Sequence, residues 1–405
     1  MQNKIFPAVI GLGYVGLPIY LNLQKKINTI GFDIDKEKIL NLKKKIDTNN
    51  QFKKIDFFHN KTSNFTSNYL KLKKCNFFII TVPTPIFRNK KPDLGPLIRA
   101  TNIIGKIIKD EDIIVYESTV YPGVTNSICV PLIEKISKLK NKINFNVVYS
   151  PERINPGDTK HSINKITKVI ALENFKIKTK VEFVYKNLTN KLFFTNNIED
   201  AETSKVFENI QRDVNISLMN ELYIICKKMN LNYENIIKIA KTKWNFLNFN
   251  PGLVGGHCLP VDPYYLSYIA KKNKINTTLM IAGRKTNDLM EKILYKKIIS
   301  YLKTNKIKYN HKILICGLTY KPEVADLRNS LSYNIFIKIK KKYKSCSGFD
   351  PLIHSTETKK FLILNKITNF KNYKAIIFIT KHKILCKIYK KIILNKKNRI
   401  LNCML

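Results

Sequence analysis

The sequence predicts an α/β protein with two Rossmann-like, doubly wound domains joined by a long central helix. Buried strands that end in polar or proline-containing loops alternate with helical segments in the first 195 residues, as in a parallel sheet covered by helices. A segment with helical periodicity runs from about 199 to 230, and a second strand with a glycine turn begins near 310. We therefore expect three parts, at residues 1–195, 196–305 and 306–405.

The first element is the segment KIFPAVIGLGYVGLPIYLNLQ at residues 4–24, which is typical of a buried strand, a glycine turn and a helix. Further strands end in acidic, hydroxyl or proline residues, as strands do when their carboxyl ends form a ligand crevice. These strands are expected within residues 27–35, 75–85, 112–122 and 144–154 of the first domain, and within 311–330, 346–351 and 374–380 of the second.

The first glycine turn carries the G-x-G-x-x-G pattern of dinucleotide-binding proteins, with Gly11, Gly13 and Gly16 followed by Asp33. Such glycines permit a tight turn and let a pyrophosphate approach the helix N-terminus. The carboxylate of Asp33 would accept hydrogen bonds from a ribose 2′-hydroxyl and repel a 2′-phosphate, which favours NAD over NADP. Asp35 is a second candidate, but it lies just beyond the strand. A glycine turn without a ligand is the alternative.

The composition is strongly basic, with 72 Lys and Arg against 29 Asp and Glu and a formal net charge of +43. The lysines are spread along the whole chain, so we expect affinity for anionic ligands and no specific nucleic-acid partner. A basic nucleic-acid-binding protein on a Rossmann scaffold is a remote alternative, and steep loss of that binding with salt would indicate it.

The eight cysteines are scattered, without a CxxC pair, so neither a disulfide framework nor a metal site is indicated and a reducing compartment is expected. No stretch approaches about 18 uninterrupted apolar residues, so no membrane span is expected. The expected location is cytoplasmic.

Cys258 lies in the stretch NPGLVGGHCLPVDPYYL, residues 250–266, which is unlike a regular helix or strand. Its glycines would let a ligand approach the backbone, and Pro260 and Pro263 would stiffen the loop. A thiol beside a nicotinamide site suggests covalent chemistry on an aldehyde. His257 either lowers the pKa of the thiol or supports the backbone. The alternative for Cys258 is a small buried apolar residue.

Several motifs, in this order along nearly the whole chain, resemble those of the UDP-glucose/UDP-N-acetylmannosamine dehydrogenase family. They are VIGLGYVGLP, VPTP, YESTVYPGVT, YSPERINPGD, QRDVNISLMNEL, TKWNFL, PGLVGGHCLPVDPYYL and GLTYKPEVADLRNS. Within the family the chain is most similar to the UDP-N-acetylhexosamine 6-dehydrogenases of capsule and O-antigen synthesis. Asn250 departs from the Arg or Tyr of many relatives, so the resemblance leaves the hexosamine open.

The resemblance implies NAD-dependent oxidation of the C6 hydroxyl of UDP-GlcNAc or UDP-GalNAc to a uronic acid. Two hydride transfers would pass through a thiohemiacetal and a thioester on Cys258, in a cytoplasmic homodimer whose C-terminal domain holds the UDP. UDP-N-acetylmannosamine and UDP-glucose are alternative substrates. A dehydrogenase that stops after one hydride shares the first-domain pattern but would not need Cys258.

By the same resemblance, Lys205 would stabilise oxyanions or help proton transfer, and Asp262 would orient or deprotonate a water. Glu152 would assist thioester hydrolysis, and Thr119 would position water near the nicotinamide. The implied cofactor-binding residues are Gly11, Gly13, Tyr14, Val15, Gly16, Asp33, Thr84, Thr119 and Arg328. The implied substrate-binding residues are Glu152, Arg153, Ile154, Lys205, Asn209, Arg212, Gly255 and Lys321. The spacing of Lys205, Asn209 and Arg212 predicts one helix face.

Overall fold

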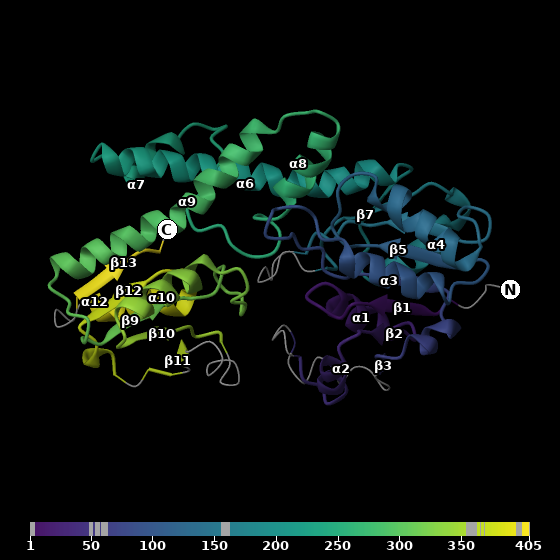
Figure 1. The fold of residues 1–405 in the computed structure, drawn as a ribbon, viewed down its shortest axis with the longest axis horizontal. Coiled ribbons are helices and arrows are strands. Elements are labelled where there is room, and N and C mark those ends of the chain that lie inside the picture. The colour runs from purple at the N-terminus through teal and green to yellow at the C-terminus, as the bar shows by residue number, and fades with distance from the viewer. Residues whose placement is uncertain are drawn as a thin grey trace. The chain divides into compact units, whose positions relative to one another are not determined.

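The computed structural model describes residues 5–47, 52, 57, 64–154, 163–353, 363–364, 366–367, 369–393 and 399–404. The chain divides into two compact units. Unit 1 comprises Met1–Glu208 and Tyr264–Ile275, and unit 2 comprises Asn209–Pro263 and Asn276–Leu405. The predicted α/β class, with two Rossmann-like sheets and a long central helix, is confirmed (Figure 1). The three domain boundaries expected from the sequence stay a prediction.

Unit 1 contains an eight-stranded sheet, counted over the described residues, in the order β3-β2-β1-β4-β5-β6-β7-β8. Its strands are β1 (Pro7–Ile10), β2 (Ile30–Phe32), β3 (Phe65–Thr66), β4 (Phe77–Ile80), β5 (Ile113–Tyr116), β6 (Asn146–Tyr149), β7 (Lys168–Leu172) and β8 (Leu192–Thr195). Its helices include α1 (Gly16–Gln24), α2 (Lys36–Lys43), α3 (Gly95–Gly105), α4 (Val130–Ser137) and α5 (Lys178–Tyr185), with shorter turns η2 (Tyr69–Lys74), η3 (Thr125–Cys129) and η4 (Phe175–Ile177).

One strand pair departs from the parallel sheet that the sequence predicts. β6 and β7 pair antiparallel, with Val148 opposite Leu172 and Tyr149 opposite Ala171, whereas the other neighbouring strands of this sheet pair in parallel. A parallel pair needs a crossover, usually a helix. No helix appears in the described residues of the connection, 150–154 and 163–167, and β7 returns along β6 in the opposite direction.

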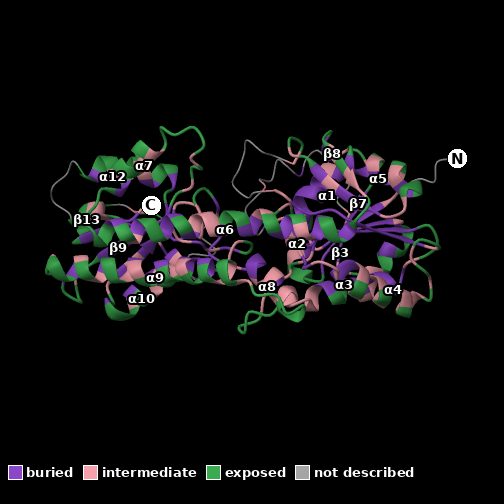
Figure 2. Cartoon of the chain, turned by 90° about the horizontal axis from the view of Figure 1, so that it is seen from above, coloured by how far each residue is buried: buried purple, intermediate pink, exposed green. Residues whose placement is uncertain are grey.

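The central strands β1, β4 and β5 of unit 1 are buried along their whole length, which is why they are continuous or nearly continuous apolar runs (Figure 2). On one face, Val9, Ile79 and Val115 pack in a core with Leu17 and Leu21 of α1 and with residues of α5. Helix α3 is also linked to the sheet: the hydroxyls of Thr101 in α3 and Tyr116 in β5 share a buried hydrogen bond of 2.9 Å. The sheet is therefore a rigid support for the loops at its carboxyl edge.

The long central helix is α6 (Ile198–Lys228), as predicted, and it contributes residues to both units. It is followed by α7 (Tyr233–Ala240), α8 (Asp262–Lys272) and α9 (Thr278–Thr304). The stretch 250–266 was expected to avoid regular structure throughout. Residues 250–261 do so, but α8 begins at Asp262, because Pro263 is tolerated in the first turn of a helix, where its missing N–H is not needed.

In the part of unit 2 that the structure describes, five strands form a parallel sheet in the order β11-β10-β9-β12-β13. The strands are β9 (Ile313–Cys316), β10 (Cys346–Phe349), β11 (Ile363–Leu364), β12 (Ala375–Phe378) and β13 (Arg399–Asn402). Ile313 and Ile315 face a core with α9 and α10 (Leu331–Lys342), and Leu314 and Cys316 face a second core with α12 (Lys383–Ile393). A short turn, η5 (Phe370–Asn372), precedes β12.

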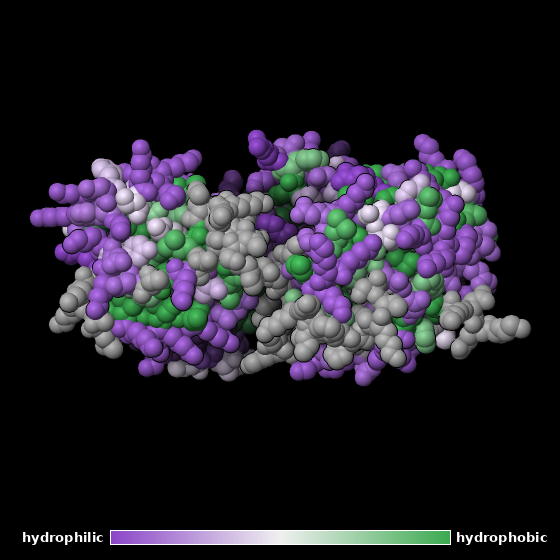
Figure 3. All heavy atoms as spheres, turned by 90° about the horizontal axis from the view of Figure 1, so that it is seen from below, coloured by the Kyte–Doolittle hydropathy of each residue, from purple (hydrophilic) through white to green (hydrophobic). Residues whose placement is uncertain are grey.

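Hydrophilic side chains are spread across each unit on the face drawn in Figure 3, with smaller hydrophobic patches between them. This distribution agrees with basic residues dispersed along the chain. Among the described residues, the structure contains no helix with the length and apolar character needed to cross a bilayer.

Candidate active site

The glycine turn of unit 1 connects β1 to α1. The lack of a side chain has a different consequence at each of its three glycines. Gly11 has a φ of +92°, which favours glycine. A Cβ on Gly16 would lie 1.9 Å from the carbonyl oxygen of Gly11, so the helix can pack this closely only with glycine there. A Cβ on Gly13 would meet nothing within 4 Å, which leaves open space in front of the turn.

That opening fits a pyrophosphate. Val15, the N-cap residue of α1, makes no side-chain hydrogen bond to the first turn of the helix, and the positive end of a helix favours an anion. Tyr14 and Val15 are half-buried in the same turn. The residues present therefore fit the phosphates of a dinucleotide.

Asp33 follows β2 and lies beside this turn. One carboxylate oxygen, Oδ2, accepts a 2.9 Å hydrogen bond from the N–H of Leu12 and pairs with Nζ of Lys38 at 2.9 Å. The other oxygen accepts a hydrogen bond from the N–H of Asp35. Asp35 itself caps α2 by accepting from the N–H of Lys38. The structure thus assigns Asp35 a capping role and leaves Asp33 as the acid next to the glycine turn.

Two threonines at the carboxyl edge of the same sheet are linked directly. The hydroxyl of Thr84, beyond β4, donates a 2.6 Å hydrogen bond to the carbonyl of Thr119, beyond β5. The carbonyl of Thr84 in turn accepts a 2.9 Å hydrogen bond from the buried hydroxyl of Tyr265 on α8. These contacts fix the two loops that were expected to face cofactor and water.

Glu152 lies beyond β6 in a buried cluster of charged groups. Nζ of Lys168 lies 2.7 Å from Glu152 and 2.6 Å from Glu117, and all three side chains are at most 6% exposed. The hydroxyl of Tyr185 donates to Glu117, and the N–H of Ile154 donates to Glu152. Burial opposes ionisation of Glu152, but Lys168 and the N–H of Ile154 hold its pKa below the usual value.

The neighbouring carboxyl behaves differently. Burial raises the pKa of Glu117 to about 7, although Lys168 works against that rise, and the nearby charge of Glu152 adds to it. Two carboxylates around one ammonium therefore titrate apart, which is typical of acid–base sites.

Arg153 follows Glu152 and reaches helix α6. Its guanidinium pairs with Glu208 at 2.7 Å, and both side chains are partly exposed. Glu152 and Arg153 belong to the motif YSPERINPGD. Residues 155–158 of this motif lie outside the described part of the chain.

All eight cysteines lie in the described part of the chain as thiols, and Cys258 is the exposed one among them. Its carbonyl accepts 2.9 Å hydrogen bonds from the N–H groups of Val261 and Asp262, which forms the turn that leads into α8. The alternative that Cys258 is a buried apolar residue is therefore wrong. Its exposure fits a thiol that meets a substrate.

The glycines before Cys258 were expected to let a ligand approach the backbone. In the structure, other residues of the protein lie next to Gly255 and Gly256. A Cβ on Gly255 would lie 2.6 Å from the carbonyl oxygen of Asn329. Gly256 has a φ of +90°, and a Cβ on it would lie 2.7 Å from the ring of Tyr320. The two glycines are needed because this loop packs tightly against the turn after β9.

His257 also faces that turn. Its Nε2 lies 3.4 Å from Oδ2 of Asp326, and Asp326 is further paired with Arg328 at 2.8 Å. Burial would raise the pKa of Asp326, but the hydrogen bonds from His257 and Arg328 lower it to about 2. His257 was expected either to lower the pKa of the Cys258 thiol or to support the backbone. Its contact with Asp326 favours the second role. Lys321 lies half-buried in the same turn, where its carbonyl accepts from Thr319.

Helix α6 carries the remaining candidates. Lys205 and Asn209 are buried on one face, whereas Arg212 is exposed. The amide of Asn209 donates a 2.5 Å hydrogen bond to Oδ2 of Asp262, which is 3% exposed. A residue predicted to bind the sugar and a residue predicted to orient or deprotonate a water are thus in contact within unit 2.

A polar network in unit 2 supports the start of the cysteine loop. Asn220 of α6 exchanges two hydrogen bonds with the backbone of Gly252, at 2.7 and 3.0 Å. Asn220 also bonds to Asn287 of α9, which bonds to Asp213, and Asp213 pairs with the buried Arg284 at 2.6 Å. These residues have no individual signal in the sequence.

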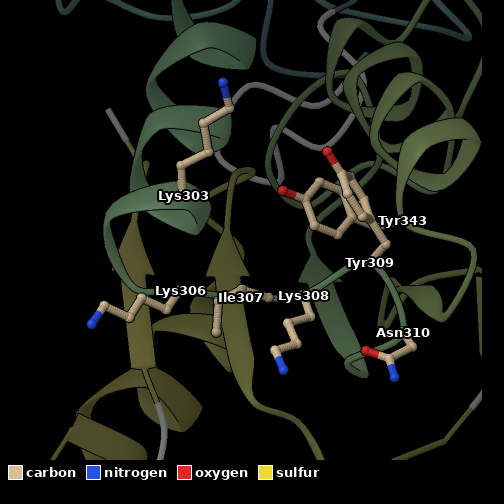
Figure 4. Close-up of a pocket in the computed structure, with 7 residues that line it drawn as sticks. All are labelled: Lys303, Lys306, Ile307, Lys308, Tyr309, Asn310 and Tyr343. Atoms are coloured by element: carbon tan, nitrogen blue, oxygen red, sulfur yellow. The ribbon is translucent and has the colours of Figure 1, made fainter.

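A hollow of about 570 Å³ lies elsewhere in unit 2, at the end of α9 (Figure 4). It contains none of the predicted site residues. The rings of Tyr309 and Tyr343 face one another with centroids 5.2 Å apart. The ammonium groups of Lys303, Lys306 and Lys308 point in different directions, so they do not converge on one anion.

The glycine turn, the opening at Gly13 and the acid after the next strand define a dinucleotide-binding protein. Comparison with known proteins narrows this class. Three models of the UDP-glucose/GDP-mannose dehydrogenase family match the chain: the NAD binding domain at residues 5–189, the central domain at 199–289 and the UDP binding domain at 314–403. The chain belongs to this family, and NAD is its cofactor.

Individual relatives agree. The chain is 42% identical over 380 residues to protein CapL of Staphylococcus aureus, covering 93% of this chain and 89% of CapL. It is 42% identical to a UDP-N-acetyl-D-glucosamine 6-dehydrogenase of Pseudomonas aeruginosa, covering 86% and 83%. The solved structure of a UDP-D-ManNAc dehydrogenase from Pyrococcus horikoshii is similar with a TM-score of 0.83 at 27% identity, covering 98% of this chain and 95% of that one.

Proposed function

We propose that this enzyme oxidises the C6 hydroxyl of UDP-GlcNAc or UDP-GalNAc to the carboxylate, for surface polysaccharide synthesis. The observation that carries the proposal is Cys258, the exposed cysteine of the chain, in a loop that both glycines and His257 hold in place. Relatives with the names given above support the substrate class. The acid product is of the kind that a glycosyltransferase would add to a polymer.

The oxidation needs two steps at one carbon, and Cys258 holds the carbon between them. NAD, when bound, would supply the hydride acceptor, with a fresh molecule of NAD for each of the two steps. The thiolate of Cys258 adds to the C6 aldehyde to form a thiohemiacetal, and its oxidation leaves a thioester. Lys205 stabilises the oxyanions that develop. Asp262, whose carboxylate accepts a hydrogen bond from Asn209, orients or deprotonates a water.

Hydrolysis of the thioester needs a positioned base. Glu152 takes a proton from water as the water attacks the thioester carbon, and the C–S electron pair returns to Cys258. Thr119 orients the water, and the hydroxyl of Thr84 holds the backbone of Thr119 in place. Arg153, Ile154, Arg212, the backbone of Gly255 and Lys321 bind the UDP-sugar, and Arg328 binds the cofactor.

The enzyme acts as a homodimer in the cytoplasm. Leu218, Leu222 and Ile225 are 38–53% exposed on α6, at spacings of four and three residues, and Met229, 63% exposed, directly follows the last residue of the helix and extends this stripe. Exposed segments along α6 and α7 are visible in Figure 2. A second copy of the chain would cover this stripe. The eight thiols support a reducing compartment.

The deciding experiment incubates the purified enzyme with NAD and, separately, UDP-GlcNAc, UDP-GalNAc, UDP-ManNAc and UDP-glucose, and follows NADH and acid. We expect two NADH per molecule of UDP-GlcNAc or UDP-GalNAc consumed. Cys258→Ser should bind UDP-sugar and NAD nearly as the native enzyme does but form no acid, because a serine alkoxide is far less available at neutral pH.

The matched control is Cys386→Ser, at a half-buried cysteine of α12, which should retain native acid formation. Release of free aldehyde with one NADH per sugar, or sustained acid production by Cys258→Ser, would overturn the covalent route. Greater turnover of UDP-ManNAc or UDP-glucose would overturn the substrate assignment.

A further inference from the structure

Lys168 is the first residue of β7. It lies at the edge of the sheet where the neighbouring strand β6 ends, because β7 runs antiparallel to β6. In the antiparallel register, Val148 lies opposite Leu172 and Tyr149 opposite Ala171. The same register carried three residues further places Lys168 opposite Glu152, and their side chains meet at 2.7 Å. In a parallel strand, the first residue of β7 would lie at the other edge of the sheet.

The ammonium is shared between two carboxylates and is almost fully removed from water. Lys168 is 1% exposed, and its Nζ lies 2.6 Å from Oε2 of Glu117, which is itself 0% exposed. A buried ion cluster of this kind is weak evidence for stability, because apolar residues of the same volume often stabilise as much or more. Its position next to Glu152 points to a role in that residue's chemistry.

We propose that Glu117, Lys168 and Glu152 form one proton-transfer unit, in which Lys168 positions Glu152 and Glu117 stores the proton that Glu152 takes from water. This inference rests on the proposed function, in which Glu152 is the base of thioester hydrolysis. It assigns roles to two buried residues outside the set predicted from the sequence.

The proton balance closes without any further reactant. As the water oxygen bonds to the thioester carbon and the C–S bond breaks, one proton of the water passes to Glu152. Lys168 then accepts that proton while it gives one of its own to Glu117, so the ammonium is unchanged and Glu152 is again a carboxylate. No electron is transferred, and Glu117 later returns the proton to solvent.

The groups around Glu117 are consistent with this storage role. Lys168 faces it from β7, Glu152 from beyond β6, and Tyr185 from α5, where the Tyr185 hydroxyl donates to the second oxygen of Glu117. A carboxyl that exchanges its proton near neutral pH can accept it only when ionised. Thioester hydrolysis should therefore rise with pH through a limb near 7.

The test follows one turnover of the native enzyme and of three variants with NAD and UDP-GlcNAc. Decay of the acyl adduct on Cys258 is measured by intact mass after quenching, from pH 5.5 to 9. Glu117→Gln keeps the shape of the side chain but cannot store a proton. We expect both NADH to form at native rates, adduct decay at least tenfold slower at pH 8, and no limb near pH 7.

In Lys168→Met, decay of the adduct should also be at least tenfold slower than in the native enzyme. Lys165→Met, the same change at an exposed lysine three residues earlier, should leave the decay rate unchanged. Native decay rates and an unchanged pH limb in Glu117→Gln would overturn the inference, even if Lys168→Met fails to fold. So would a native decay rate in folded Lys168→Met. Failure of the native enzyme to form acid would instead overturn the proposed function first.

Discussion

His257 and Asp326 are joined by a contact of 3.4 Å between Nε2 and Oδ2, which ties the loop of Cys258 to the turn after β9. The same carboxylate accepts hydrogen bonds from the backbone and side chain of Arg328. Asp326 therefore links the loop of Cys258 to the turn after β9, and its ionisation should control the stability of both.

The pH dependence of stability follows from the sign of this shift. Because His257 and Arg328 outweigh burial, the folded-state pKa of Asp326 is about 2, below the unfolded value of about 3.9. The stabilisation is present above pH 4 and is lost as pH falls toward 2. Asp326→Asn should cost about 1–2 kcal/mol at pH 7 and about half as much at pH 3, measured by urea unfolding. Equal costs at both pH values would contradict this.

Gly16 and Gly13 offer a matched pair of substitutions in one turn. Gly16→Ala would place Cβ 1.9 Å from the carbonyl oxygen of Gly11, so it should destabilise the enzyme by more than about 2 kcal/mol. Gly13→Ala meets no protein atom and should leave the melting temperature unchanged while it weakens NAD binding at least tenfold. Calorimetry of unfolding and of NAD binding separates the two. Unchanged NAD affinity in Gly13→Ala would place the pyrophosphate elsewhere.

Cofactor choice should depend on the charge of Asp33. The native enzyme should use NAD at least about a hundredfold better than NADP in kcat/KM, because a carboxylate there repels a 2′-phosphate. Asp33→Asn keeps an acceptor for the N–H of Leu12 and releases Lys38 from its ion pair, so it should reduce that preference at least tenfold. Comparable native turnover with the two cofactors would rule out this role.

The exposed stripe on α6 predicts the oligomeric state. Replacing both Leu222 and Ile225 by Glu should convert the proposed dimer to a monomer, because two charges would be buried without partners at the interface. Light scattering coupled to gel filtration measures the change. Ile143→Glu, at an apolar residue that is 79% exposed in a loop of unit 1, should leave the proposed dimer intact. A native protein that is monomeric at micromolar concentration would disprove the interface.

The buried pair of Arg284 and Asp213 should show strong coupling. Arg284→Met leaves the carboxylate of Asp213 buried without its main counter-charge, so we expect a loss of about 3–5 kcal/mol in the free energy of unfolding. The double variant with Asp213→Leu should recover most of that loss. Additive losses in the double variant would mean that the two side chains act independently.

Much of the fold could be predicted from local patterns. The spacing of Gly11, Gly13 and Gly16 after an apolar run, with Asp33 after the next, specifies a strand, turn and helix because each feature is a property of a short segment. The 3.6-residue period of α6 and the glycine and proline frame of Cys258 are local in the same sense. These features were sufficient to indicate the fold and the dinucleotide, and to single out Cys258 as the candidate thiol.

Only the tertiary structure decided which distant groups meet. Lys168 is one of many lysines in the sequence, and its partnership with Glu152 and Glu117 depends on the direction in which β7 pairs. Likewise, the neighbour of Gly256 is Tyr320 rather than a ligand, and His257 faces Asp326 rather than the thiol next to it in the chain. Strand direction and loop packing are set by pairing and burial summed over the whole unit, so no pattern within one segment records them.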